Sequence, residues 1–357
     1  MTTGSKLAVS VMMAVVSAQV SAVELGEFNG TTFAVDGYVK AEGVFIMPDD
    51  GDNSFEGSAR QSRINFSMAR TIGEHKTLAF IEGDFWDDST EADSSYAWRL
   101  RHAYVSVDDV TVGQTWNGQF FATAPFDVGM INFFGSGTGG IAGNGAVVRP
   151  DLVLHYKLGG ALFSLQDPAY SDADYPDLVA SYTHRTESGH AFNVAVTGRD
   201  VETGNGDASE FGAALSVAGK LKFGNTDLSL SAFSGEGAGV YAGWGFNGAR
   251  GTATSDVDES GDLITTTGFS AGIAHQFTDK LQGIVRYGQV EADEVAAGMD
   301  EDTLEMTNVT LIYNYLPKLE LGLEWRDQNV ANRPPSAAST SQRPAGSQVE
   351  VMARYRF

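Results

Sequence analysis

Apolar and polar residues alternate along most of this chain, in short segments separated by turns. The last segment shows the pattern most clearly, because one face is apolar and the other is charged. Its apolar residues are Val349, Val351, Tyr355 and Phe357, and its charged residues are Glu350, Arg354 and Arg356. A period of two residues predicts β-strands whose faces meet different surroundings.

About sixteen such segments are expected, which indicates an all-β chain. Most are close to the roughly 9–11 residues that a tilted strand needs to cross a membrane. The expected strands are Thr32–Phe45, Arg63–Ala69, Thr77–Trp86, Ala97–Val107, Val110–Trp116, Val147–Leu158, Ala161–Asp167, Leu178–Arg185, Ala191–Arg199, Glu210–Lys222, Asp227–Ser234, Ile264–Phe277, Leu281–Val290, Thr303–Leu316, Leu319–Asp327 and Ser347–Phe357.

The connections between these segments alternate between tight turns and long, acidic loops. Tight turns such as Asp108-Asp109 and Pro317-Lys318 contrast with long stretches such as 235–262 and 328–346. Short turns at one end and long loops at the other are typical of a bacterial outer-membrane barrel. The pattern therefore predicts a transmembrane antiparallel up-and-down β-barrel in the outer membrane, in contact with lipids and lipopolysaccharide.

The phase of the charges predicts which face of each strand points inward. A Lys or Arg that faces lipid at mid-bilayer costs about 2–4 kcal/mol, so charged positions are assigned to the lumen. His102 falls on the outward side in mid-strand, and we expect it at a contact between subunits. The small outward residues Gly37, Ala41 and Gly43 also favour close packing of neighbouring barrels.

Residues 114–150 break the alternation with a long run that is rich in Gly and aromatic residues. Long loops in regular β proteins are usually functional or disordered, and the apolar content here argues against disorder. The run is the third long connection, so we expect it to fold into the barrel and set the pore width. Its candidate constriction residues are Trp116, Phe120, Phe121, Asp127, Phe133 and Phe134.

The N-terminus and the composition place the chain outside the cytoplasm. Residues 1–22 have the features of a secretory signal peptide, with Lys6, an apolar run and a small-residue cleavage site after Ala22 or Ala18. Residues 23–357 then form the barrel domain. The chain has no Cys, and its net charge of −23 disfavours nucleic acid as a partner.

Four motifs resemble those of the DcaP-like trimeric porins of Gram-negative bacteria. They are Gly37-Tyr-Val-Lys40, Ala59-Arg-Gln-Ser-Arg63, Arg99-Leu-Arg-His-Ala-Tyr-Val105 and Gly113-Gln-Thr-Trp116. The resemblance implies a homotrimer of sixteen-stranded barrels, an inward third loop, and a basic lumen that favours small anions such as dicarboxylates. It places Arg63, Arg99 and Arg101 in that lumen. The terminal Tyr355-Arg356-Phe357 resembles the aromatic end that the barrel-assembly machinery recognises in outer-membrane barrels.

These observations predict a porin for passive diffusion, with no catalysis, no cofactor and no metal site. The expected anion path consists of Arg63, Arg99, Arg101, Arg149, Lys157 and Lys40. Charged rings of this kind set the preference of a pore. The alternatives are that these groups pair with acidic residues such as Glu82 and Asp84, which gives a non-selective porin, or that the barrel is a plugged structural or adhesion protein.

Overall fold

The computed structural model describes most of the barrel wall and part of the loops. The described residues are 22–87, 97–119, 126–128, 131, 149–168, 173–203, 208–242, 256–294, 302–330 and 344–357. The predicted signal peptide and four of the candidate constriction residues, Phe120, Phe121, Phe133 and Phe134, lie outside them. Among the described residues, no helix is long and apolar enough to cross a membrane.

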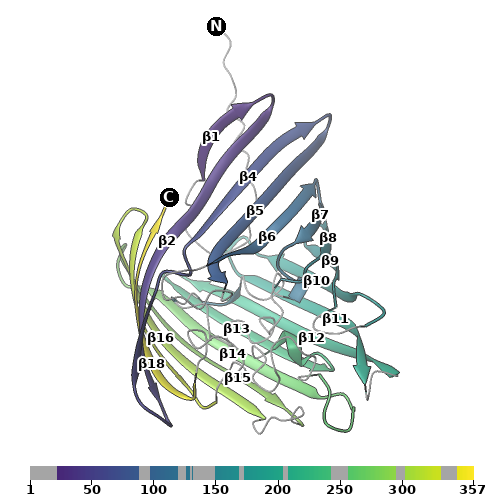
Figure 1. The fold of residues 1–357 in the computed structure, drawn as a ribbon, viewed down its shortest axis with the longest axis vertical. Helices are drawn as coiled ribbons and strands as arrows, with labels where there is room; N and C mark the ends of the chain where they lie inside the picture. The colour runs from purple at the N-terminus through teal and green to yellow at the C-terminus, as the bar shows by residue number, and fades with distance from the viewer. Residues whose placement is uncertain are drawn as a thin grey trace.

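The described strands form one antiparallel sheet, and a short 3-10 turn follows β13 (Figure 1). The elements are β1 (Val23–Phe28), β2 (Thr31–Pro48), β3 (Ser54–Ser58), β4 (Arg63–Ile72), β5 (His75–Asp87), β6 (Ala97–Val107), β7 (Val110–Gln114), β8 (Val153–Leu158), β9 (Ala161–Gln166), β10 (Asp177–Arg185), β11 (Ala191–Thr203), β12 (Ala208–Phe223), β13 (Thr226–Glu236), η2 (Gly239–Tyr241), β14 (Thr265–Gln276), β15 (Leu281–Ala292), β16 (Thr303–Leu316), β17 (Leu319–Gln328) and β18 (Gly346–Arg356).

The sheet closes on itself into a barrel of sixteen strands. Each strand from β4 to β18 pairs with the next, and β18 pairs with β2, which in turn pairs with β4. Closure leaves no open edge, as a membrane barrel requires. All sixteen strands lie where the alternation places them, although β8 begins at Val153 rather than at Val147.

Strands β1 and β3 lie outside this count, because both pair with parts of the long strand β2. β3 pairs with its loop-side half from Glu42 to Ile46, and β1 pairs with its other end from Thr31 to Val35. β18 ends opposite Tyr38, so β1 continues the edge of the wall where β18 stops. In Figure 1 this end of β1, β2, β4 and β5 rises beyond the rest of the barrel.

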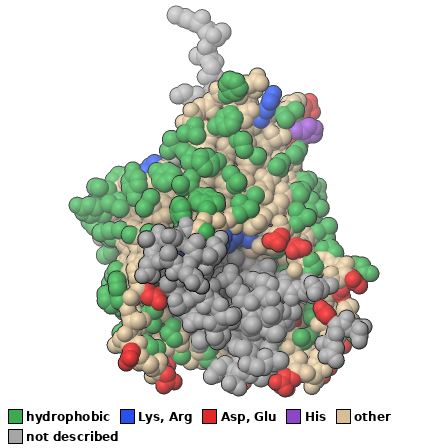
Figure 2. All heavy atoms as spheres, viewed as in Figure 1, with side chains coloured by type: hydrophobic (Ala, Val, Ile, Leu, Met, Phe, Trp, Pro, Cys, Tyr) green, Lys and Arg blue, Asp and Glu red, His purple; other side chains and the backbone are tan. Residues whose placement is uncertain are grey.

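The outside of the wall is apolar and the inside is polar. Outward residues such as Val39, Leu230, Val285 and Leu323 remain exposed, and hydrophobic side chains dominate the outer surface (Figure 2). Acidic side chains gather at the lower rim of that view, where the long connections lie. This division matches a barrel whose exterior contacts hydrocarbon and whose interior faces water.

One part of the inward–outward prediction is wrong. β6 contains a bulge at Arg101, because Glu82 pairs with His102 while Gly83 pairs with Leu100. An extra residue reverses the side-chain phase beyond it. His102 therefore points into the barrel and is buried. Tyr104 also points inward, where it stacks on Phe80. His102 is not available for a contact between subunits.

The small outward residues of β2 have partners within the chain. A Cβ atom on Gly43 would lie 2.9 Å from the ring of Phe55, so that ring occupies the space that the missing side chain leaves. At Gly37 a Cβ atom would lie 2.3 Å from the Arg63 carbonyl oxygen and 3.0 Å from the Phe357 ring. These two glycines therefore accommodate the chain's own side chains and backbone, and packing against another barrel stays a prediction.

Candidate functional site

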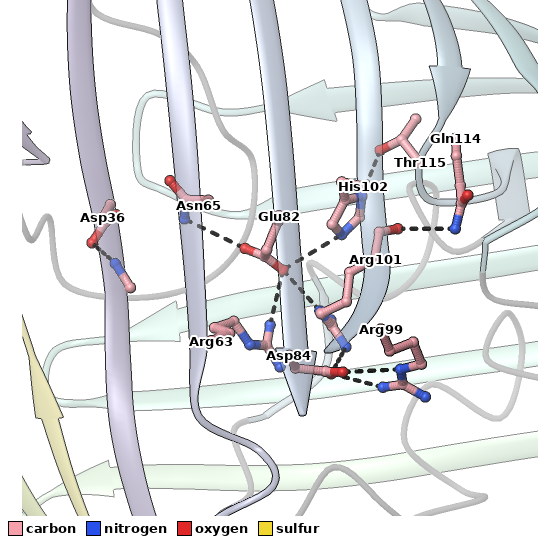
Figure 3. Close-up of polar contacts among 11 residues, drawn as sticks. Asp36, Arg63, Asn65, Glu82, Asp84, Arg99, Arg101, His102, Gln114 and Thr115 are labelled. Atoms are coloured by element: carbon pink, nitrogen blue, oxygen red, sulfur yellow. Dashed lines mark hydrogen bonds and ion pairs between the residues drawn. The ribbon is translucent and has the colours of Figure 1, made fainter. Parts of the chain in front are cut away.

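A cluster of arginines and carboxylates covers the lumenal face of β4, β5 and β6 (Figure 3). Arg63 on β4 and Arg99 on β6 are both direct neighbours of Asp84 on β5. Residues that face each other on neighbouring strands have side chains about 5 Å apart, so this register brings the charges together. The cluster follows from the alternation itself, because all these charged residues occupy inward positions.

The carboxylates of Asp84 and Glu82 each bind more than one arginine. Arg99 donates two hydrogen bonds to Asp84, from Nε at 2.9 Å and from Nη2 at 2.7 Å. Arg101 donates from Nε to Glu82 at 2.8 Å and from Nη1 to Asp84 at 3.0 Å. Arg63 Nη1 lies 3.6 Å from Glu82 Oε1. Such charge-assisted pairs fix the arginine side chains against the wall.

The loop that follows β7 joins this cluster at its first residues. The Trp116 ring contacts two guanidinium groups, with Arg149 Cζ 5.1 Å and Arg101 Cζ 5.6 Å from its centroid. His102 packs edge-on against the same ring and its Nδ1 lies 3.1 Å from Thr115 Oγ1. Cation–π contacts of this kind hold Arg149 beside the other arginines.

A second group of arginines continues the basic surface onto β18. The ring of Tyr38 on β2 has three guanidinium carbons around it, with Arg63 at 4.9 Å, Arg354 at 5.6 Å and Arg356 at 5.8 Å. Glu320 on β17 lies 2.5 Å from Arg354 Nε and 3.5 Å from Arg356 Nε. We call the lumenal side chains of Tyr38, Arg63, Arg99, Arg101, Arg149, Arg354 and Arg356 the arginine wall.

Two members of the arginine wall are more exposed than the carboxylates that they bind. The side chains of Arg63 and Arg99 are 20% exposed, whereas Glu82 is 10% and Asp84 only 1% exposed. Arg101 is buried beside these carboxylates, with 2% of its side chain exposed. A solute in the lumen therefore meets Arg63 and Arg99 before it meets Asp84, although the pairing with Glu82 and Asp84 is also present.

Lys40 and Lys157, which the sequence places in the same path, lie elsewhere. Lys40 is 1% exposed, and its Nζ binds Glu42 at 2.5 Å and the carbonyl oxygen of Ile131 at 2.7 Å. It therefore fastens the long loop to the wall. Lys157 is exposed near the short turn that follows β8. Alternation assigns both residues to the inward face, but it does not predict how far each is buried or where along the barrel it lies.

The described residues of the 114–150 connection touch the lumenal wall at widely separated places. Near its start, the Gly118 amide donates to Gln166 on β9 at 2.9 Å, and Ser216 on β12 donates to Gln119 at 2.9 Å. Asp127 accepts a hydrogen bond from Arg286 on β15 at 2.9 Å. Ile131 lies against β2 through Lys40 and donates its amide proton to Glu324 on β17 at 3.0 Å.

These contacts place the described residues Gly118, Gln119, Asp127 and Ile131 against the lumenal side of the wall, whereas the constriction by the whole connection stays a prediction. They also reveal anchors that the sequence alone does not identify as such, namely Gln166, Arg286 and Glu324. Within the described ranges, no group of three His, Asp or Glu side chains converges as a metal site would require. The geometry instead offers fixed charges and hydrogen-bonding groups on the inside of a closed wall.

Comparisons with known proteins match the fold but identify no family. No family model matches the chain, and no curated protein matches it. The outer-membrane channel DcaP of Acinetobacter baumannii has a similar structure, with a TM-score of 0.73 and 19% identity over 94% of this chain and 100% of that chain.

Two other solved structures extend the comparison. The anion-selective porin from Comamonas acidovorans has a TM-score of 0.64 and 16% identity over 92% of this chain and 100% of that chain. The trimer form of OmpT, an outer-membrane protein of Vibrio cholerae, has a TM-score of 0.62 and 13% identity over 92% of this chain and 100% of that chain. At these identities the similarity establishes the porin-type barrel fold.

Proposed function

We propose that this protein is an outer-membrane porin through which small polar solutes diffuse passively, with a preference for anions. The observation that carries the proposal is the arginine wall on the inside of a closed, externally apolar barrel. Guanidinium groups that are fixed in place and partly exposed attract carboxylates and other anions. Low-dielectric walls focus that field into the channel.

The similarity to DcaP and to the Comamonas anion-selective porin supports this proposal. Small dicarboxylates are the solutes that we expect to suit the arginine wall, because several guanidinium groups lie close together in it. A homotrimer is also proposed, supported by the trimer form of OmpT. The terminal Phe357 is proposed as the signal for the barrel-assembly machinery, and residues 1–22 as the export signal.

The preference is tested by removing two arginine charges with the double variant R63Q/R99Q. At about 6 Å in a watery lumen, one unit charge changes the energy of a passing ion by about 0.7 kcal/mol. That change corresponds to about threefold in permeability for each charge removed. Reversal potentials under a salt gradient in planar bilayers should therefore shift strongly towards cations.

The matched control is K280Q, which removes a positive charge at an exposed turn on another part of the ring. It should leave the reversal potential as it is in the unaltered protein. Cation preference of the unaltered protein would contradict anion selectivity while leaving a general porin in place. A barrel without measurable conductance would favour the plugged structural protein instead.

A further inference from the structure

One wall of the lumen carries apolar side chains near the end with the long connections. Phe233 on β13, Val290 on β15 and Leu304 on β16 occupy inward positions, yet each is no more than 3% exposed. The lumen of a porin is polar and filled with water, so inward apolar residues of this size require a cover. Something other than water occupies this part of the barrel.

The cover is a short segment of the connection between β13 and β14. Ala238, Val240, Tyr241 and Ala242 all have exposures of 0–1% and pack with the three wall residues in one hydrophobic cluster. The segment includes η2. Residues 237–242, here called the inner segment, thus form a small dry core within the barrel.

A buried polar clamp of Arg199, Asp177 and Asp256 holds the inner segment in place. Arg199 on β11 binds Asp177 Oδ2 at 3.1 Å, Asp256 Oδ2 at 2.6 Å and the Gly237 carbonyl oxygen at 3.1 Å. Tyr241 donates its hydroxyl proton to Asp177 at 2.5 Å. The three charged side chains have no exposed surface, so each depends on the others for its solvation.

The clamp also binds a later part of the connection between β13 and β14. Asp256 accepts a hydrogen bond from the Val240 amide at 3.1 Å, which ties the start of the connection to its later part. Burial raises the pKa of Asp256, and the Arg199 guanidinium opposes that rise. Breaking the pair between Arg199 and Asp256 would leave a carboxyl group buried without its cation, which is costly.

Gln166 connects the inner segment to the long 114–150 connection. Its Nε2 donates to the Tyr241 hydroxyl at 2.5 Å, and its Oε1 accepts from the Gly118 amide at 2.9 Å. One side chain therefore joins both inward-folded connections. The inner segment follows β13, which lies eight strand positions from β5 in the ring of sixteen, and so it begins opposite the part of the arginine wall that lies on β4, β5 and β6.

We propose that the inner segment is a second, fixed constriction, positioned by Arg199, that confines solutes to the side of the lumen bearing the arginine wall. Its effect on conductance rests on the proposed porin function, whereas its buried position does not. Arg199 is a positioning residue in this arrangement, because both of its carboxylate partners are also buried and it does not face the water-filled path.

Thiol labelling tests the buried position directly, because the chain has no Cys of its own. V240C should resist a membrane-impermeant maleimide, whereas S260C, in an exposed part of the same connection, should react readily. Adding R199Q should speed labelling of V240C by at least about tenfold, since labelling follows the population of the opened segment. Labelling of V240C at the rate of S260C without R199Q overturns the proposal.

Conductance tests the constriction, with heat-modifiable migration on a gel confirming that each variant is folded. R199Q should raise single-channel conductance and admit larger sugars into proteoliposomes, and Y241F should do so to a smaller extent. Y241F keeps the ring but loses the hydroxyl, so it remains informative if R199Q does not fold. The matched control Y175F, at an exposed tyrosine, should change neither.

The labelling and conductance experiments together distinguish failure of the constriction from failure of the porin function. If R199Q releases the segment in the labelling assay but conductance and sugar size limit stay unchanged, the constriction is wrong and the porin stands. If the unaltered barrel is silent but R199Q conducts, the segment closes the lumen and the porin proposal fails. Silence of both proteins overturns both proposals.

Discussion

At the scale of single residues, Asp84 determines how the arginine wall is arranged. Its carboxylate binds Arg99 through two hydrogen bonds and Arg101 through a third, and its side chain is almost wholly buried. A buried carboxylate between two guanidinium groups has no water to replace either partner. Asp84 therefore both fixes the two arginines and cancels part of their charge.

The substitution D84N should thus have two opposite effects. It removes one negative charge beneath the arginine wall, so the anion preference in bilayers should rise by about threefold. It also removes the buried anion that Arg99 and Arg101 share, leaving Arg101 with Glu82 alone, which should lower the free energy of unfolding by about 3–5 kcal/mol. Reversal potentials and urea denaturation measured by gel migration check the two effects.

A matched substitution at a second carboxylate beside the arginine wall, Glu320 on β17, separates charge from structure. E320Q removes an acidic group that binds Arg354 but whose side chain is 17% exposed, so water can solvate the arginine that remains. It should raise the anion preference with a smaller loss of stability. An unchanged reversal potential in both variants would show that the carboxylates do not influence permeation.

At the scale of elements, Lys40 fastens the long connection to the wall. Its ammonium group binds the Ile131 carbonyl oxygen, the Gln61 amide oxygen at 2.9 Å and the carboxylates of Glu42 and Glu350. K40M should release this anchor and leave two buried carboxylates without their cation. Single-channel recordings should then show larger current fluctuations, and the urea midpoint should fall.

The control for this prediction is K280M, which changes an exposed lysine on a turn. It should leave both the current fluctuations and the urea midpoint as in the unaltered protein. If K40M conducts with the same low noise as the control, the anchor at Ile131 does not hold the connection in place. The other contacts of the connection, such as that between Asp127 and Arg286, would then be enough to hold it against the wall.

The elements also show what alternation can and cannot predict. It predicts all sixteen strands of the ring, because each must keep one apolar face towards hydrocarbon and one polar face inward. It fails at Arg101, where a bulge turns His102 and Tyr104 inward, because a bulge depends on the register between two strands. Of the expected site, Arg63, Arg99, Arg101, Arg149 and Trp116 do come together.

Depth and loop contacts are the parts of the site that the sequence does not determine. Lys40 and Arg63 occupy equivalent inward positions, yet one is covered by the long connection and the other is partly exposed. The inward positions of the apolar residues Val290 and Leu304 could have predicted a cover from the sequence, because apolar side chains conflict with a water-filled lumen. What covers them is set by tertiary contacts far apart in sequence, such as Arg199 with Asp256.

At the scale of the whole molecule, the barrel is taller on one side than on the other. The ends of β1, β2, β4 and β5 rise beyond the other strands (Figure 1), and β2 is the longest described strand, with 18 residues. The tall side remains apolar on its exterior, with Phe66, Met68 and Ile81 exposed. Its rise beyond the other strands sets this apolar surface apart from the rest of the outer wall, which contacts hydrocarbon.

We therefore expect the tall side to lie at the centre of a homotrimer. The double variant F66S/M68S should weaken the trimer, because it removes apolar contact area that lipid can replace only in part. Native mass spectrometry in mild detergent should show trimers for the unaltered protein and an increased fraction of monomers for this variant. The matched control I273S/V285S changes two exposed apolar residues on β14 and β15, and it should remain trimeric.

The result of this trimer test would also explain why β1, β2, β4 and β5 extend beyond the other strands. Strands longer than the hydrocarbon thickness require cover at the ends that leave the membrane, and neighbouring subunits provide it without lipid. If both double variants dissociate equally, the loss reflects general destabilisation and the tall side is not the interface. A monomeric unaltered protein would contradict the trimer itself and leave the extension of β1, β2, β4 and β5 as a feature of the single barrel.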